Sequence, residues 1–314
     1  MTEVKKNSIR AWFLAIRPKT LTGAIAPVLL GLSLAWIDSS LYQPAFGQTS
    51  VFQWIPAVLC MLFAVLMQID ANFINDYFDC LNGVDGEERL GPQRACQQGW
   101  ISMTAMQRGI ALVTCLSLAV GLPTVFWGGL EMIIVGVLCI VFAFLYTTLL
   151  SRLGLGDLLV LIYFGLVPVC ITYYVQLHCV PRHVLAFGIA MGLVTDTLLI
   201  VNNYRDRETD RMVGKNTLVV SIGEKASEWL YLGLGIAAVA LCQFAWTTGH
   251  EWGAILPILY LVPHTLAWLK MKRIHKGRAL NSVLGITALN IFLFAVLASV
   301  GYLLPELISK WIVR

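Results

Sequence analysis

The chain has 314 residues, of which 58% are hydrophobic and only 13% are charged, and its formal net charge is +4. Soluble domains carry roughly 25% charged residues, so this composition excludes an ordinary soluble protein and indicates one embedded in a lipid bilayer. The basic residues lie in the N-terminal arm and in the connections between apolar stretches, and they are not interleaved with aromatic residues as in nucleic-acid-binding surfaces, so we expect no nucleic-acid partner.

Nine apolar stretches are long enough to cross a bilayer as helices, since a hydrocarbon core of about 30 Å takes roughly 20 residues. We therefore predict an all-α, polytopic membrane protein in which residues 1–314 form a single membrane-embedded domain, a bundle of nine transmembrane helices. The longest polar connections lie at about 80–103 and 204–227. The predicted spans are 21–38, 53–74, 104–126, 130–150, 157–177, 183–203, 228–246, 254–270 and 283–304.

The basic residues also predict an orientation. With nine spans, 19 of the 22 Lys and Arg residues fall on one side of the membrane, and only Arg182, Lys310 and Arg314 fall on the other. Because basic segments are retained in the cytoplasm during insertion, we expect a cytoplasmic N-terminus and a C-terminus outside. The protein would then lie in the cell (inner) membrane with both long polar connections facing the cytoplasm.

The first long connection follows a run of amides and carboxylates, which we call the first acidic segment. It extends from Asn72 to Arg94 and has the sequence NFINDYFDCLNGVDGEERLGPQR. Residues three or four apart share a face of a helix. We therefore expect Asn72, Asp76 and Asp79 to form one stripe, with Asn75 beside Asp79.

A second acidic segment follows the sixth predicted span. It begins at Asn202 and has the sequence NNYRDRETDRMVGKNTL. Asn202, Asp206 and Asp210 fall at positions i, i+4 and i+8, which again makes one helical stripe. One D-x-x-x-D pattern is a weak signal, and charged loop residues are often merely solvated. Two copies, each led by Asn and each after an even-numbered span, indicate an internal duplication and a functional site.

Two stripes of carboxylates at the same end of a bundle would repel each other, and a bound divalent cation would neutralise that repulsion. Oxygen ligands that share a site with phosphate oxygens are typical of Mg²⁺ rather than zinc. We therefore expect bound Mg²⁺ with the metal ligands Asp76, Asp79, Asp206 and Asp210, which are also the candidate catalytic residues.

Neighbouring polar side chains are candidates for binding a phosphorylated substrate. Arg94, Arg205 and Lys215 would pair with phosphate oxygens that the metal leaves uncovered. The positive-inside bias alone would also retain each of these basic residues, so both interpretations stay open. The candidate substrate-binding residues in the two acidic segments are Asn72, Asn75, Arg94, Asn202, Arg205 and Lys215.

Four segments of the chain resemble the UbiA family of membrane prenyltransferases. Within the family, the likeness is greatest to members that act on 1,4-dihydroxy-2-naphthoate in the menaquinone pathway, and the stretches ERLGP and GKNTL are typical of them. The similar segments are RPKTLTGAIAPVLLG from Arg17, NDYFDCLNGVDGEERLGPQR from Asn75, GLGDLLVLIYFGLVPV from Gly154, and NNYRDRETDRMVGKNTLVVSIG from Asn202.

This resemblance implies an enzyme that transfers a polyprenyl group from polyprenyl diphosphate to 1,4-dihydroxy-2-naphthoate with loss of diphosphate and CO2, giving demethylmenaquinol. The resemblance further implies two Mg²⁺ ions, which would bridge the diphosphate to the aspartates of both acidic segments, with Asp85 as the third acid of the first segment and a further metal ligand. Tyr146 is a candidate for shielding the allylic cation, and Arg152 for binding a headgroup or carboxylate.

Other classes of membrane protein also carry clustered acids. A transporter would place them near the middle of the membrane at broken helices, whereas these lie at expected helix ends beside long connections, which favours an enzyme. Phospholipid headgroup transferases use D-G-x-x-A-R, which this sequence lacks. Other prenyl acceptors, such as 4-hydroxybenzoate, remain alternatives. Two intramembrane acids, Asp70 and Asp196, either bind acceptor hydroxyls or join helices by hydrogen bonds.

Overall fold

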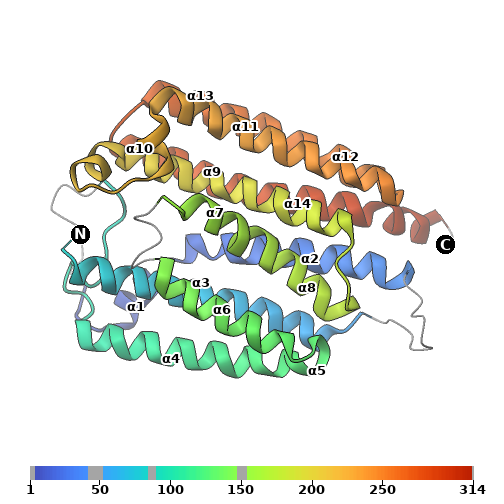
Figure 1. Ribbon diagram of the computed structural model, residues 1–314, viewed down its shortest axis with the longest axis horizontal. Coiled ribbons are helices and arrows are strands. Elements are labelled where there is room, and N and C mark those ends of the chain that lie inside the picture. The colour runs from blue at the N-terminus through green and yellow to red at the C-terminus, as the bar shows by residue number, and fades with distance from the viewer. Residues whose placement is uncertain (1–3, 42–51, 84–89, 147–153, 313–314) are drawn as a thin grey trace.

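The computed structural model describes residues 4–41, 52–83, 90–146 and 154–312, and every regular element in these ranges is helical. This confirms the predicted all-α class. Figure 1 shows the longer helices running side by side along the long axis of the molecule. The helices are α1 Ile9–Ile16, α2 Thr22–Leu41, α3 Trp54–Leu81, α4 Met103–Gly121, α5 Val125–Gly128, α6 Glu131–Leu145, α7 Gly156–Leu161, α8 Val167–Leu177, α9 Arg182–Met212, α10 Leu218–Ile222, α11 Glu224–Cys242, α12 Glu251–Ile255, α13 Leu261–Ile274 and α14 Asn281–Ile312.

Eight helical segments of the described chain are long and apolar enough to cross a membrane, and they match eight of the nine predicted spans. The remaining prediction, 130–150, coincides with α6, which has 15 residues and falls short of a full crossing. Residues 147–150 of that prediction lie outside the described residues, so nine spans are not confirmed. The eight segments are Thr22–Ser39, Trp54–Leu81, Met103–Gly128, Gly156–Leu177, Arg182–Met212, Glu224–Thr248, Glu251–Ile274 and Arg278–Pro305.

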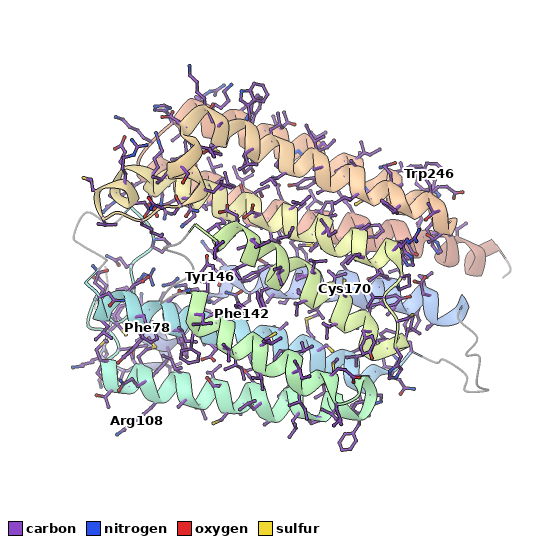
Figure 2. All side chains as sticks on the ribbon, viewed as in Figure 1. Phe78, Arg108, Phe142, Tyr146, Cys170 and Trp246 are labelled. Atoms are coloured by element: carbon purple, nitrogen blue, oxygen red, sulfur yellow. The ribbon has the colours of Figure 1, made fainter. Side chains whose placement is uncertain are left out.

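The two ends of the bundle differ in what they carry. The C-terminal ends of α3 and α9 lie at the end where the described chain begins, and α14 ends at the opposite end (Figure 1). Figure 2 places Arg108 toward the first of these ends and Trp246 toward the other. Both acidic segments are therefore at the same end of the bundle, as the sequence predicts. The cytoplasmic orientation of that end stays a prediction.

The outer faces of the helices expose large apolar side chains, including Leu112, Ile134 and Val262, which are 61%, 63% and 63% exposed. Such a surface would be an aggregation hazard in water, but it suits contact with lipid. Inside the bundle α2 packs against α8 and α14, α3 against α4, and α9 against α7 and α11. The largest buried cluster joins α2, α8, α9 and α14 around residues such as Leu34, Phe187 and Phe294.

Glycines bring the chain from α7 to α8 unusually close to α9. A β-carbon on Gly165 would lie 2.4 Å from Cα of Gly192, and one on Gly192 would lie 2.6 Å from the carbonyl oxygen of Leu161. In lipid, where apolar burial drives helix association weakly, small residues allow backbones to approach and pack closely. A π-helical turn, Ile162–Leu166, separates α7 from α8 at this contact.

Candidate active site

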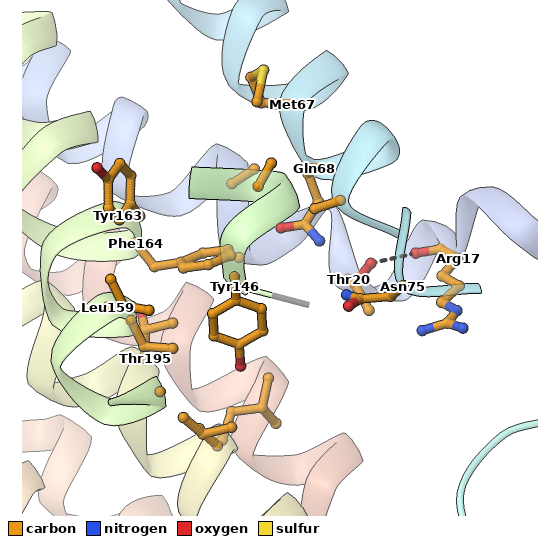
Figure 3. Close-up of a pocket in the computed structure, with 18 of the residues that line it drawn as sticks. Arg17, Thr20, Met67, Gln68, Asn75, Tyr146, Leu159, Tyr163, Phe164 and Thr195 are labelled. Carbon is orange, nitrogen blue, oxygen red and sulfur yellow. Dashed lines mark hydrogen bonds between the residues drawn. The ribbon is translucent and has the colours of Figure 1, made fainter. Parts of the chain in front are cut away.

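A cavity of about 1740 Å³ runs through the bundle, lined by residues of α2, α3, α4, α6, α7, α8, α9 and α14. At one end it is lined by the polar ends of α3 and α9, including Asn75, Asp79 and Asp206. It continues past Tyr146 and Phe164 (Figure 3) and reaches Gly121, at the far end of α4. One cavity thus joins a charged mouth to a long apolar interior.

The end of α3 contributes Asn75 and Asp79 to the cavity. Asp79 forms an ion pair with Arg94, whose side chain is largely buried. Nη1 of Arg94 also donates to the backbone oxygen of Asn75 at 2.6 Å. The loop after the first acidic helix therefore folds back and places a cation beside the acid of that helix.

Asp76 and Asn72, which belong to the predicted stripe of α3, do not lie in the lining of the cavity. Asp76 is fully buried, and its two oxygens accept the backbone N–H groups of Ala95 and Cys96 at 2.9 and 3.0 Å. The amide of Asn72 donates to Ile16 O and Thr20 Oγ1. Helical spacing within the first acidic segment could not predict that residues 16–20 and residues 95–96 pack against the end of α3. Asp76 therefore holds the loop in position.

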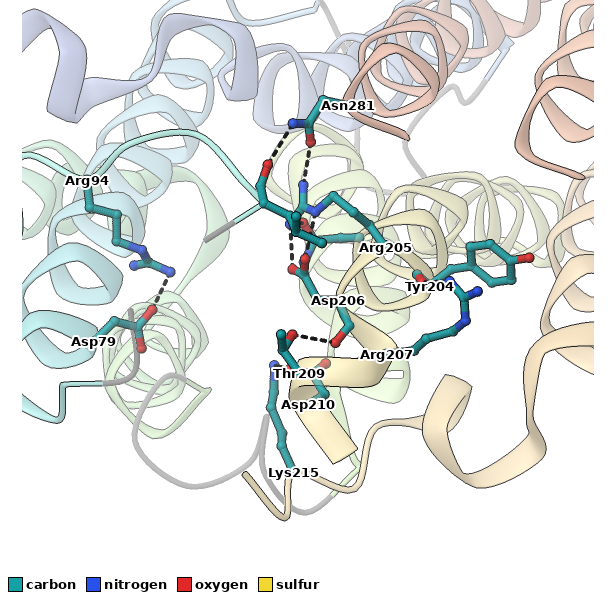
Figure 4. Close-up of polar contacts among 12 residues, drawn as sticks. Asp79, Arg94, Tyr204, Arg205, Asp206, Arg207, Thr209, Asp210, Lys215 and Asn281 are labelled. Atoms are coloured by element: carbon teal, nitrogen blue, oxygen red, sulfur yellow. Dashed lines mark hydrogen bonds and ion pairs between the residues drawn. The ribbon is translucent and has the colours of Figure 1, made fainter. Parts of the chain in front are cut away.

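The end of α9 carries the predicted stripe unchanged, because Asn202, Asp206 and Asp210 all line the cavity. Arg205, which is almost fully buried, donates to Asp206 Oδ1 at 2.7 Å and to Asn202 Oδ1 at 2.9 Å. Nζ of Lys215 lies 3.5 Å from Asp210 Oδ1. Figure 4 shows Asp206, Asp210 and Lys215 on the other side of the cavity mouth from the Asp79–Arg94 pair.

Three carboxylates at the mouth of the cavity, on Asp79, Asp206 and Asp210, are each paired with a basic side chain. Oδ2 of Asp210 is buried and has no hydrogen-bond partner among the described residues. A buried carboxylate oxygen without a partner is costly, and a hard cation would satisfy it. The donor set, which is carboxylate and amide oxygen, therefore fits Mg²⁺.

The spacing of these acids suits ions that are shared with a substrate. Among the described residues, the only three potential ligands that gather within 4.8 Å of one another are Glu224, Glu228 and His275. Asp79, Asp206 and Asp210 are spread across the cavity mouth instead. Mg²⁺ is commonly held by one or two carboxylates together with substrate phosphates, and this arrangement matches that pattern.

Arg17 is a cavity residue that the sequence did not single out, because a basic residue before the first span is explained by topology alone. It lines the cavity, and its backbone is left-handed with a φ of 54°. Nη2 of Arg17 is buried with no hydrogen-bond partner among the described residues. Burial and the nearby charge of Arg94 lower the pKa of Arg17 to about 10. Arg17 is placed to receive an anion.

Asn281, at the start of α14, forms hydrogen bonds with both halves of the site, the half at the end of α3 and the half at the end of α9. Its amide nitrogen donates to the carbonyl oxygen of Leu90, which follows the first acidic helix, and its oxygen accepts from Arg205 at 2.8 Å (Figure 4). No sequence pattern marked this residue. Of the other predicted site residues, Tyr146 lines the cavity, whereas Asp85 and Arg152 lie outside the described residues.

The sequence model of the UbiA prenyltransferase family matches residues 39–294. The chain belongs to this family. The chain is therefore a membrane prenyltransferase.

Several relatives within the UbiA family share much of the sequence. A 1,4-dihydroxy-2-naphthoate octaprenyltransferase from Haemophilus influenzae is 35% identical, over 81% of this chain and 82% of its own length. An enzyme of the same name from Mycobacterium leprae is 31% identical, over 92% of this chain and 95% of its own length.

Solved structures of UbiA homologues share the fold. One from Aeropyrum pernix has a TM-score of 0.64 at 19% identity, covering 90% of this chain and 98% of its own. One from Archaeoglobus fulgidus, bound to DMAPP and Mg²⁺, has a TM-score of 0.59 at 18% identity and covers 92% of this chain and 99% of its own.

Proposed function

We propose that this protein transfers a polyprenyl group from a polyprenyl diphosphate to 1,4-dihydroxy-2-naphthoate, in a magnesium-dependent reaction that releases diphosphate and CO2 and gives demethylmenaquinol. The observation that carries the proposal is the joining of two acid-bearing helix ends and a long apolar interior in one cavity. The acceptor is supported by the names of the relatives from Haemophilus influenzae and Mycobacterium leprae.

The mouth of the cavity suits a diphosphate held through metal. Asp79 would bind one Mg²⁺ from α3, and Asp206 and Asp210 a second from α9. Bound there, the ions would supply positive charge that neutralises the departing diphosphate. Arg17, Arg94 and Lys215 would contact the phosphate oxygens that the metals leave uncovered. Asp76 would act indirectly, by holding the loop that carries Arg94.

The apolar interior suits the prenyl tail and the cation formed at its end. Phe142, Tyr163 and Phe164 line the cavity beyond the acids, and the rings of Phe142 and Tyr163 lie 4.7 Å apart, centroid to centroid. Aromatic faces attract positive charge, and an interior without water protects an allylic cation from hydrolysis. The lipid-like tail would remain in an apolar environment throughout the reaction.

We also infer that the acidic end of the bundle faces the cytoplasm, because 19 of 22 basic residues fall on that side in the predicted topology and basic segments are retained there. A cysteine introduced at Gln98, in the loop beside the cavity mouth, would then react with a membrane-permeant thiol reagent but not with an impermeant reagent added outside intact cells.

The function is tested with purified protein in lipid nanodiscs supplied with octaprenyl diphosphate. Incubation with carboxyl-labelled 1,4-dihydroxy-2-naphthoate should release labelled CO2 only when Mg²⁺ is present, and removal of Mg²⁺ by a chelator should stop the release. With 4-hydroxybenzoate in place of the naphthoate, we expect no prenylated product. Equal turnover of the two acceptors would reject the proposed acceptor.

A further inference from the structure

A second pair of acids lies deeper than the metal-binding acids, where α7 contacts α9. Asp157 is in the first turn of α7 and lines the cavity, and Asp196 is 6% exposed on α9, behind the lining. The close glycine contact between Gly192 and the backbone of Leu161 fixes these two helices against each other. The pair is therefore a product of helix packing, since the two residues are 39 positions apart in the sequence.

The carboxyl groups of Asp157 and Asp196 are close enough to influence each other's ionisation. Because two neighbouring carboxylates repel each other, a proton on one of them stabilises the pair. In addition, Oδ1 of Asp157 and Oδ1 of Asp196 are both buried without a hydrogen-bond partner among the described residues. Acids at membrane depth are costly, and a functional role is the usual reason for their presence.

The acid pair lies near Tyr146, in the cavity that also contains the acids of the mouth. A β-carbon on Gly156, next to Asp157, would lie 3.9 Å from the hydroxyl of Tyr146. Tyr146, Asp157 and Asp79 all line the same cavity. A donor whose diphosphate is held at the mouth would extend past Tyr146 toward the pair.

We propose that Asp157 binds a ring hydroxyl of the aromatic acceptor and carries its proton during the reaction, with Asp196 as the residue that positions it. This inference rests on the proposed function. It adds to that function a residue that takes up a proton and binds the aromatic substrate. Asp157 is the member of the pair that faces the cavity, and one of its carboxyl oxygens has no other described hydrogen-bond partner.

The proton transfer balances without an outside reagent. The ring carbon that bears the carboxylate forms a C–C bond to the allylic carbon, whose C–O bond to diphosphate breaks. The adjacent hydroxyl, made acidic by this loss of ring electrons, passes its proton to Asp157. The bond to the carboxylate then breaks, CO2 leaves, and the electron pair returns to the ring oxygen, which takes the proton back from Asp157. No oxidant or reductant is consumed.

The test compares Asp157→Asn and Asp157→Glu with the wild-type protein in nanodiscs, with the rate of labelled CO2 release as the readout. General acid–base catalysis contributes about 10²- to 10⁴-fold, so Asp157→Asn should lower kcat by about 100-fold or more. The KM for octaprenyl diphosphate should stay within about twofold, because the donor is held at the mouth. Asp157→Glu, which keeps a carboxyl group, should recover most of the loss.

Asp70→Asn is the matched control. Asp70 is also a fully buried acid within a predicted span, with an oxygen that lacks a described partner, but it accepts from Thr114 at 2.7 Å and does not line the cavity. This variant should keep wild-type kcat. A kcat for Asp157→Asn within threefold of wild type, or equal losses in Asp157→Asn and Asp157→Glu, would overturn the inference. A wild-type protein that fails to turn over the naphthoate would instead reject the proposed function.

Discussion

The ends of α3 and α9 carry similar acidic segments, yet they contribute differently to the cavity. At the end of α9, both predicted acids, Asp206 and Asp210, face the cavity. At the end of α3, Asp79 faces the cavity while Asp76 binds the backbone of the following loop. The difference arises from what packs beside each helix end, since residues 94–96 cover one side of α3.

The two ends also obtain their basic partners in different ways. Arg205, paired with Asp206, comes from the same helix and is the preceding residue. Arg94, paired with Asp79, comes from the loop that Asp76 holds. The acid–base pair at the end of α9 is thus formed by two residues of one helix. The pair at the end of α3 depends on how the following loop folds. The predicted effects of substitutions follow from this contrast.

The largest expected effect is loss of turnover in Asp79→Asn and in Asp206→Asn, which removes a metal-binding charge from either helix end. Each should lower kcat/KM by at least about 10³-fold, because charge stabilisation of the leaving group is the main source of catalysis in such sites. The rate is measured as CO2 release, and thermal unfolding is expected to be little changed. A near-normal rate in either variant would show that one helix end is dispensable.

A smaller and different effect is expected for Asp76→Asn. Asn has one acceptor oxygen in place of two, so one of the backbone groups of Ala95 and Cys96 loses its bond, at a cost of about 1–3 kcal/mol in stability. Activity should fall because Arg94 moves, but the Mg²⁺ concentration for half-maximal rate should be unchanged. Asp210→Asn is the comparison, since it should raise the Mg²⁺ requirement with little loss of stability. The opposite assignment of these two phenotypes would identify Asp76 as a metal ligand.

Arg205→Lys should reduce activity about tenfold or more. Three nitrogens of Arg205 bond to three residues, Asp206, Asn202 and Asn281, and a lysine has one nitrogen and no planar fork to replace them. Arg207→Lys is the control, because Arg207 lies on the same helix but contacts Tyr204 and Glu224 outside the cavity lining. Equal effects of the two changes on kcat/KM would mean that Arg205 acts only as a general positive charge.

The smallest expected effect is that of Asn281→Ala, which unlinks the two halves by removing the bonds to Leu90 and Arg205. A hydrogen bond contributes about 0.5–1.5 kcal/mol, so KM for the donor should rise about fivefold with kcat nearly unchanged. Steady-state kinetics at varied octaprenyl diphosphate measures this. An unchanged KM would show that the halves align without Asn281.

The sequence predicted the parts of the site that depend on local periodicity. The stripe of Asn202, Asp206 and Asp210 follows from helical spacing along a single uninterrupted helix. The contact of Asp76 with the backbone of Ala95 and Cys96 could not be predicted in this way, because it depends on a loop about twenty residues later in the chain. Asp196 was noted as an intramembrane acid, but its pairing with Asp157 depends on helix contacts that no local pattern encodes.

Arg17 shows a second limit of sequence patterns. It was overlooked because its charge had a sufficient explanation in topology. Only the fold shows that Arg17 lines the same cavity as Asp79.

The central claim is that acids from two helix ends hold one diphosphate through bound cations. The most direct test is the binding of a non-reactive farnesyl thiodiphosphate to the wild type, Asp79→Asn, Asp206→Asn and the double variant, with and without Mg²⁺. We predict that each single change lowers affinity strongly in Mg²⁺ and little without it, and that the double change costs less than the sum of the two. Wild-type affinity and Mg²⁺ dependence in either single variant would contradict the account.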